Sequence, residues 1–213
     1  MARIVIAGGH GQIARLLYPL LLARGDTALG IIRNPEQEAA LTALGAQPIL
    51  CDMERESDLG PFVNGADAVV FAAGAGPGSG PERKQTVDLG AAVNLMNACM
   101  AKGVQRYVMI SAIGAADPDA GSEEMQPYLW AKAEADQFLE SSPLADTIVR
   151  PGRLTDDAPT GHVSVGDDVG RDDIARADVA AVVAACLQLD QTIGKSFNVV
   201  RGLISIENAL KSL

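Results

Sequence analysis

The sequence has few of the side chains that bind metal ions or form disulfides. Its 213 residues include only three cysteines, Cys51, Cys99 and Cys186, and two histidines, His10 and His162. The cysteines are odd in number, widely spaced and each set among apolar residues, which predicts buried thiols in a reducing cytoplasm. Two histidines and such scattered cysteines do not make a zinc site, so we expect no metal.

Long apolar runs and positive charge are also scarce. The longest apolar runs, such as residues 16–23, are far shorter than the ~20 residues that cross a bilayer. The first residues lead into a strand with no signal-peptide pattern. The 17 Lys and Arg against 27 Asp and Glu give a net charge of −10, which disfavours non-specific binding to nucleic acid. We therefore expect a soluble cytoplasmic protein that binds neither a membrane nor nucleic acid.

The chain has no fixed repeat, and 48% apolar against 21% charged residues excludes a disordered protein. Short runs rich in Val and Ile alternate with amphipathic stretches of helical period. Such runs are typical of strands buried on both faces of a parallel sheet, and the alternation predicts a doubly wound α/β sheet. The predicted strands are residues 3–7, 28–32, 47–50, 68–72, 106–111, 146–149 and 195–200, and the predicted helices are 12–24, 36–44, 87–102, 128–141 and 178–189.

The first predicted strand leads directly into a glycine-rich turn, Gly8-x-x-Gly11-x-x-Ala14, which opens a helix. In this pattern Gly8 permits the tight turn, Gly11 lets the backbone approach a pyrophosphate, and Ala14 allows close packing of helix on strand. The phosphates would lie on the free N–H groups of the helix N-terminus. The pattern can also be an ordinary βα turn, but the strand before it and the helix after it favour dinucleotide binding. We assign cofactor contacts in this turn to Gly8, His10, Gly11, Gln12 and Ile13.

No shift in composition marks a second domain, so we predict one Rossmann-type domain over residues 1–213. The last 60 or so residues should form a small C-terminal lobe on the substrate side, continuous with the sheet. Residues 153–175 are expected to be its substrate-side loop region.

The end of the second predicted strand bears on the choice of dinucleotide. An NAD site usually has an acid about 20 residues beyond the glycines, whereas this chain has Arg33 and Asn34. The guanidinium of Arg33 suits the 2′-phosphate of NADP, although the alternative is a solvated arginine in a helix-entry loop. Asp52, after the third strand, could accept a hydrogen bond from the adenine amino group or cap a helix. We predict NADP, with NAD as the alternative.

Tyr128 and Lys132 lie four residues apart at the start of a predicted helix and therefore share one face. A nearby ammonium lowers the pKa of a phenol, which would make Tyr128 a usable proton donor or acceptor. The same lysine could hold the ribose hydroxyls of the nicotinamide half. Ser111 ends a strand at the sheet edge where open α/β folds keep their sites, although such a serine is more often a turn residue.

With these motifs the sequence resembles the short-chain dehydrogenase/reductase superfamily, in particular its atypical NmrA-like, NAD(P)-binding branch with epimerase/dehydratase-like members. The resemblance covers nearly the whole chain and includes Cys51-Asp52-Met53, Val70-Phe71-Ala72-Ala73-Gly74, Ser111-Ala112 and Arg150-Pro151-Gly152-Arg153-Leu154. It implies further cofactor contacts from Met53, Ala72, Ala73, Gly74, Lys132, Pro151 and Gly152. It also implies joint catalysis, with Tyr128 as acid and base, Lys132 on the ribose and Ser111 polarising the substrate.

The chain departs from the family pattern in two respects. It is shorter than the extended epimerases, which carry a larger substrate domain, and Ala112 rather than Ser111 could hold the catalytic register. We predict an NADP-dependent oxidoreductase acting on a small carbonyl or alcohol substrate. A non-catalytic NADP(H)-binding redox sensor is the alternative, and a nucleotide-sugar epimerase or dehydratase is a weaker one. We expect a monomer or weak homodimer, because the helices that pair larger relatives carry polar residues here.

Overall fold

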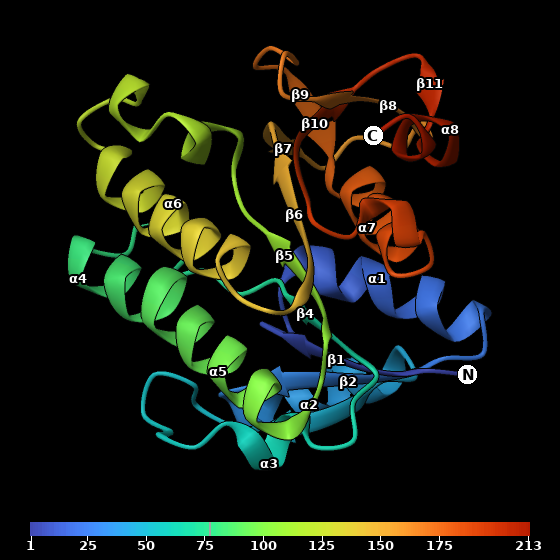
Figure 1. Ribbon diagram of the computed structural model, residues 1–213. Helices are drawn as coiled ribbons and strands as arrows, with labels where there is room; N and C mark the ends of the chain where they lie inside the picture. The colour runs from blue at the N-terminus through green and yellow to red at the C-terminus, as the bar shows by residue number, and fades with distance from the viewer. Residues whose placement is uncertain (77) are drawn as a thin grey trace.

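The computed structural model describes residues 1–76 and 78–213. The described residues form a nine-stranded sheet in the order β11-β8-β10-β6-β5-β4-β1-β2-β3, with helices on both faces (Figure 1). Within this sheet, the strands that pair in parallel are β1 (Arg3–Ala7), β2 (Thr27–Ile32), β3 (Gln47–Leu50), β4 (Ala68–Phe71), β5 (Arg106–Ile110), β6 (Ala145–Pro151) and β10 (Lys195–Arg201). The predicted doubly wound Rossmann-type fold is confirmed.

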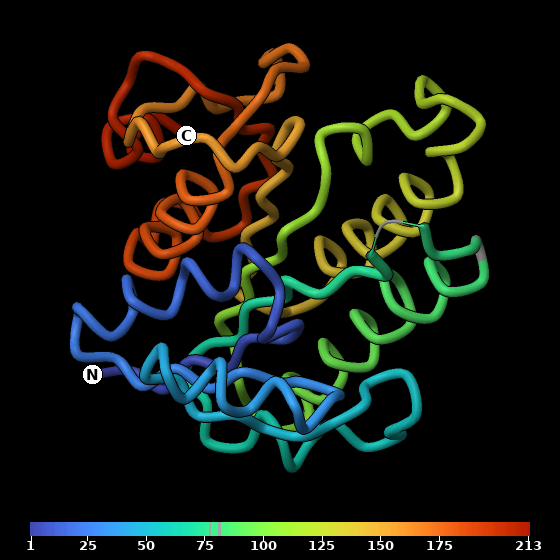
Figure 2. The backbone as a smooth tube through the Cα atoms, turned by 180° about the vertical axis from the view of Figure 1, so that it is seen from behind, coloured from blue at the N-terminus to red at the C-terminus, as the bar shows by residue number. Residues whose placement is uncertain are grey.

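Two layers of helices cover the sheet. One face carries α1 (Gln12–Ala23), α2 (Glu38–Ala43), α7 (Arg176–Cys186) and α8 (Ile206–Lys211). The other carries α3 (Gly60–Val63), α5 (Ala92–Lys102) and α6 (Gln126–Glu140). A single turn, α4 (Pro81–Arg83), and a π-helix (Lys84–Ala91) lead directly into α5. Figure 2 shows from behind that α7, far along the chain, lies beside α1.

Alternate residues of each parallel strand serve the two layers. In β1, Ile4 and Ile6 pack toward α1, whereas Val5 and Ala7 pack toward α5 and α6. All four are at most 1% exposed, because both faces of the strand are covered. This is why the buried strands read as continuous apolar runs rather than as an alternation of apolar and polar residues.

The C-terminal part adds strands that the sequence pattern does not predict. β8 (His162–Gly166) pairs antiparallel with β10, and β11 (Ile204–Ser205) pairs antiparallel with β8. β7 (Arg153–Thr155) and β9 (Asp173–Ala175) form a separate two-stranded parallel sheet. The interpretation of residues 153–175 as a loop region therefore needs correction, since β8 within it belongs to the main sheet. β7, β9 and β11 have only two or three residues each, and β8, with the sequence HVSVG, does not form a continuous apolar run.

A buried tyrosine fixes α1 to the turn that precedes it. The hydroxyl of Tyr18 donates a 2.7 Å hydrogen bond to the Gly9 carbonyl oxygen, and the side chain is fully buried. A Cβ at Gly30 in β2 would collide with this hydroxyl, so a glycine is required there. Burial raises the pKa of the Tyr18 phenol, which keeps it a hydrogen-bond donor at neutral pH.

We expect Tyr18→Phe to lower the free energy of unfolding by about 1–2 kcal/mol, because the Gly9 carbonyl loses its buried donor. Tyr107→Phe is the matched control. Tyr107 is equally buried, but its hydroxyl has no hydrogen-bond partner among the described residues, so its removal should leave stability unchanged or raise it. Urea unfolding followed by circular dichroism measures both variants. Equal losses would contradict the role assigned to Tyr18.

Candidate functional site

A cavity of about 350 Å³ opens at the carboxyl ends of β1, β2, β3 and β4. Its wall comes mainly from the turn after β1, the end of β2, the residues after β3 and the loop after β4, and α4 and the π-helix also contribute. The carboxyl edge of a parallel sheet is where doubly wound proteins bind their ligands. The predicted site residues that line this cavity are Gly8, His10, Gly11, Arg33, Asp52, Met53, Ala72, Ala73 and Gly74.

The turn after β1 is shaped to receive an anion. Gly8 has a φ of +77°, and a Cβ there would lie 2.6 Å from the Cα of Ala73. Gly11 precedes α1 in an extended conformation, and within the described chain no side chain caps this helix and its first turn holds no acid. Its first N–H groups are therefore available, and the helix dipole favours negative charge beside them.

Two residues assigned to the turn lie slightly apart from the cavity. Gln12 and Ile13 begin α1 but are not in the cavity wall. Gln12 is exposed, and Ile13 packs partly against the core. Sequence reasoning in turn missed Gln37, Cys51, Glu54, Arg83, Val87 and Ala91, which all line the cavity.

A second cavity, of about 610 Å³, lies at the ends of β5 and β6. The predicted residues Ser111, Tyr128, Pro151 and Gly152 line it, as does Ala112. Ile113, Met125, Leu129 and Leu154 give it a largely apolar wall. The rest of its lining is Gly114, Gly121, Ser122, Arg153, Arg171, Asp172 and Asp173. In the sheet, β4 lies between β1 and β5, so the two cavities follow the same edge.

Tyr128 is half-buried in the wall of the second cavity. Burial raises the pKa of its phenol above the ordinary value. The charge of Lys132, whose Nζ lies 6.0 Å from the ring centroid, lowers the pKa but does not outweigh burial. The expectation of a lowered phenol pKa is therefore wrong, because spacing reveals the charge and not the loss of solvent.

Lys132 is buried in a polar contact rather than exposed to either cavity. Its Nζ donates to the Ile110 carbonyl oxygen at 3.2 Å and lies 3.4 Å from Asp88 Oδ1. The other carboxylate oxygen of Asp88 accepts a 3.1 Å hydrogen bond from the backbone N–H of Ala75. Asp88 belongs to the π-helix, a distortion that is frequent at functional sites.

Ser111 has a partner of its own. Its hydroxyl donates a 2.9 Å hydrogen bond to Asp136 Oδ2, which also accepts a 2.8 Å bond from Arg150 Nε. Burial raises the pKa of Asp136 and outweighs the lowering by Arg150 and Ser111. Both Ser111 and Ala112 border the second cavity, so each remains a candidate for the catalytic register.

Three further observations concern metal-ligating side chains, apolar helices and cysteines in the part of the chain that is described. Within residues 1–76 and 78–213, no three His, Cys, Asp or Glu side chains are grouped to hold a metal ion. The same residues contain no helix that is long and apolar enough to cross a membrane. Cys51, Cys99 and Cys186 are free and buried.

The fold and the glycine-rich cavity define a Rossmann-type protein of the dinucleotide-binding class. The model of a family described as NAD(P)H-binding matches residues 8–190, and the chain belongs to this family. The resemblance to atypical short-chain dehydrogenases/reductases is thereby confirmed. The chain is 35% identical to the uncharacterized sugar epimerase YhfK of Bacillus subtilis over 213 residues, which are 99% of this chain and 100% of that protein.

Two solved structures are also similar. A protein of Bacillus halodurans described as an NAD-dependent epimerase/dehydratase has a TM-score of 0.95 and 36% identity, with 100% of both chains covered. The oxidoreductase ylbE of Lactococcus lactis has a TM-score of 0.86 and 27% identity, covering 99% of this chain and 96% of its own. The family thus includes relatives described as epimerases and as oxidoreductases.

We expect Lys132→Met to destabilise the fold by about 3 kcal/mol, because the buried Asp88 carboxylate loses its cation. The double variant Lys132→Met/Asp88→Asn removes both charges and keeps an acceptor for the Ala75 N–H. It should regain most of the loss. Urea unfolding of the three proteins tests this, and a single variant as stable as the wild type would show that the pair contributes nothing.

Proposed function

We propose that this protein is an NADP(H)-dependent oxidoreductase that acts on a small, mostly apolar carbonyl compound or the corresponding alcohol. One observation carries the proposal: Tyr128 and Ser111 border a cavity on the sheet edge that also holds the glycine-rich turn. Tyr128, the proposed proton-transfer group, would then lie along the edge on which a dinucleotide extends. The similarity to the oxidoreductase ylbE supports this class of reaction.

The residues present fit the cofactor. The close approach of Gly8 to Ala73 leaves no room for a side chain, and the uncapped start of α1 suits a pyrophosphate. Arg33 would hold the 2′-phosphate, and Asp52 the adenine amino group. When bound, NADP(H) supplies or accepts the hydride.

The protein itself would supply the proton that the reduction of a carbonyl group requires. A phenol is protonated at neutral pH, and burial raises the pKa of Tyr128 further, so its proton is present and could pass to a carbonyl oxygen. To polarise that carbonyl, Ser111 in the same cavity wall would have to turn its one hydroxyl proton from Asp136 to the substrate. A raised pKa keeps the phenol protonated but makes it a weaker acid, so the assignment of Tyr128 as the proton donor rests on its place in the cavity wall.

A second function has its own support. Ser111 is bonded to Asp136, and Lys132 contacts Asp88 and Ile110 and borders neither cavity. Two of the three expected catalytic residues thus make structural contacts. A redox sensor that binds NADP(H) without turnover would need the first cavity and none of the proton-transfer chemistry.

Arg33→Ala should weaken NADPH binding by about 1.5–3 kcal/mol and leave NADH binding nearly unchanged, because one charge-assisted contact to the 2′-phosphate is lost. Arg55→Ala is the control: Arg55 is an exposed arginine close by in the fold, paired with Asp52 and outside the cavity wall. Calorimetric titration of both variants with both cofactors gives the affinities. Equal wild-type affinities for NADPH and NADH would contradict the choice of NADP.

Tyr128→Phe should lower turnover by a factor on the order of 10²–10⁴ and leave NADPH affinity unchanged, because only the transferable proton is removed. Met125→Leu alters the same wall without removing a proton and controls for packing. NADPH absorbance, followed over a panel of small apolar ketones and quinones, measures the rates. Full activity of Tyr128→Phe would refute the tyrosine mechanism. If the wild type binds NADPH and reduces none of the panel, the sensor is the better description.

A further inference from the structure

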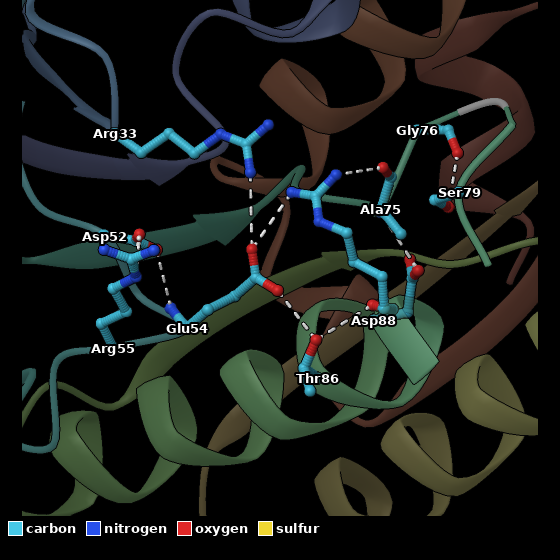
Figure 3. Close-up of polar contacts among 10 residues, drawn as sticks. Arg33, Asp52, Glu54, Arg55, Ala75, Gly76, Ser79, Thr86 and Asp88 are labelled. Carbon is cyan, nitrogen blue, oxygen red and sulfur yellow. Dashed lines mark hydrogen bonds and ion pairs between the residues drawn. The ribbon is translucent and has the colours of Figure 1, made fainter. Parts of the chain in front are cut away.

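Two arginines converge on one carboxylate at the rim of the first cavity (Figure 3). Oε2 of Glu54 lies 3.4 Å from Arg33 Nη1 and 3.1 Å from Arg83 Nη2. Its Oε1 accepts a 2.8 Å hydrogen bond from the Thr86 hydroxyl. Arg33 comes from the end of β2, Glu54 from the segment after β3, and Arg83 from α4.

The second arginine is part of the cavity in its own right. Arg33, Glu54 and Arg83 all line the wall that contains the glycine-rich turn. Arg83 Nη1 also donates a 2.9 Å hydrogen bond to the carbonyl oxygen of Ala75, in the loop after β4. The side chains of Arg33 and Arg83 are 55% and 34% exposed, so both are open to a ligand.

We propose that Glu54 occupies the place of a phosphomonoester in the free protein, and that Arg83 is the second guanidinium of this phosphate subsite, together with Arg33. The inference rests on the proposed function, since the phosphomonoester is the 2′-phosphate of NADP. Glu54 then acts as an internal competitor, and Arg83 as a residue that determines cofactor specificity.

The charges favour displacement of the Glu54 carboxylate by the 2′-phosphate of NADP, but not by NAD. A phosphomonoester carries a charge of about −1.5 to −2 and three acceptor oxygens, whereas Glu54 offers one negative charge and two oxygens. Guanidinium groups bind either anion in the same planar fork. The ribose hydroxyl of NAD cannot replace a carboxylate between two cations, so Glu54 would stay in place when NAD binds.

Glu54 is held as a charged group. Burial raises its pKa, but the hydrogen bonds from Thr86 and Arg83 and the charges of both arginines outweigh burial and leave the pKa below its usual value. The carboxylate is therefore ionised at neutral pH and would repel an incoming phosphate until it moves aside. If Glu54 instead accepted a hydrogen bond from the ribose hydroxyl of NAD, its removal would weaken NAD binding rather than tighten NADP binding.

The experiment measures the binding of NADP⁺, NAD⁺, adenosine 2′-monophosphate and adenosine 5′-monophosphate by calorimetry. Glu54→Gln should tighten the binding of NADP⁺ and adenosine 2′-monophosphate roughly tenfold, because the competing charge is gone and Thr86 keeps its acceptor. NAD⁺ and adenosine 5′-monophosphate should change less than about twofold. Glu56→Gln, an exposed acid two residues away and outside the cavity wall, controls for the loss of one negative charge.

Arg83→Ala should weaken NADP⁺ and adenosine 2′-monophosphate about tenfold and spare the other two ligands, because one charge-assisted contact is lost. Arg55→Ala is its control. The inference is overturned if Glu54→Gln leaves NADP⁺ binding unchanged or weaker, if it weakens NAD⁺ selectively, or if Arg83→Ala has no effect on NADP⁺. A wild type that prefers NADP⁺ while these variants show no effect refutes this inference alone. A wild type without preference refutes the proposed function as well.

Discussion

The turn between β1 and α1 depends on two glycines, because its backbone lies directly against the two neighbouring strands. A Cβ on Gly9 would lie 2.7 Å from the Cα of Gly30, and one on Gly8 would meet Ala73 just as closely. Gly30 in turn leaves room for the Tyr18 hydroxyl, which holds the Gly9 carbonyl. The turn, β2, the end of β4 and α1 are thus one packed unit. The first cavity takes its shape from this unit, because its wall is built from the same strand ends.

Buried charges hold the other half of the site. The contacts of Lys132 with Asp88 and Ile110 join α6 to the π-helix and to the end of β5, and Asp88 also binds the backbone of Ala75 beside the first cavity. The bonds of Asp136 to Ser111 and Arg150 join α6 to the region of β5 and β6. Both contacts fix α6 and with it Tyr128, which lies near its start. Activity lost on removing Lys132 is therefore ambiguous between a ribose contact and a displaced helix, unless the stability of the variant is known.

The sequence predicts the features that depend on residues close together along the chain, namely the buried strands and the glycine-rich turn. Continuous apolar runs identify the buried strands, and the glycine spacing identifies the turn, because each follows from local geometry. The sequence does not predict contacts between distant residues. Glu54 contacts Arg33, which is 21 residues away, and Arg83, which is 29 residues away. Only the pairing of β2 with β3 and the position of α4 bring them together. The predicted direction of the Tyr128 pKa shift was wrong for a related reason. A four-residue spacing reveals the charge of Lys132 but not the burial that outweighs it.

In the proposed function, the choice of cofactor and the choice of substrate would depend on different forces. The proposed phosphate subsite is made of partly exposed charges, and interactions between such charges weaken as salt rises. The second cavity is walled mainly by apolar side chains from other elements, whose contribution follows the area removed from water. If the proposed subsite is correct, charge substitutions at Arg33, Glu54 or Arg83 would alter the preferred dinucleotide without disturbing the walls around Tyr128. Relatives that share this fold can then differ in cofactor while keeping one cavity, or differ in substrate while keeping one cofactor.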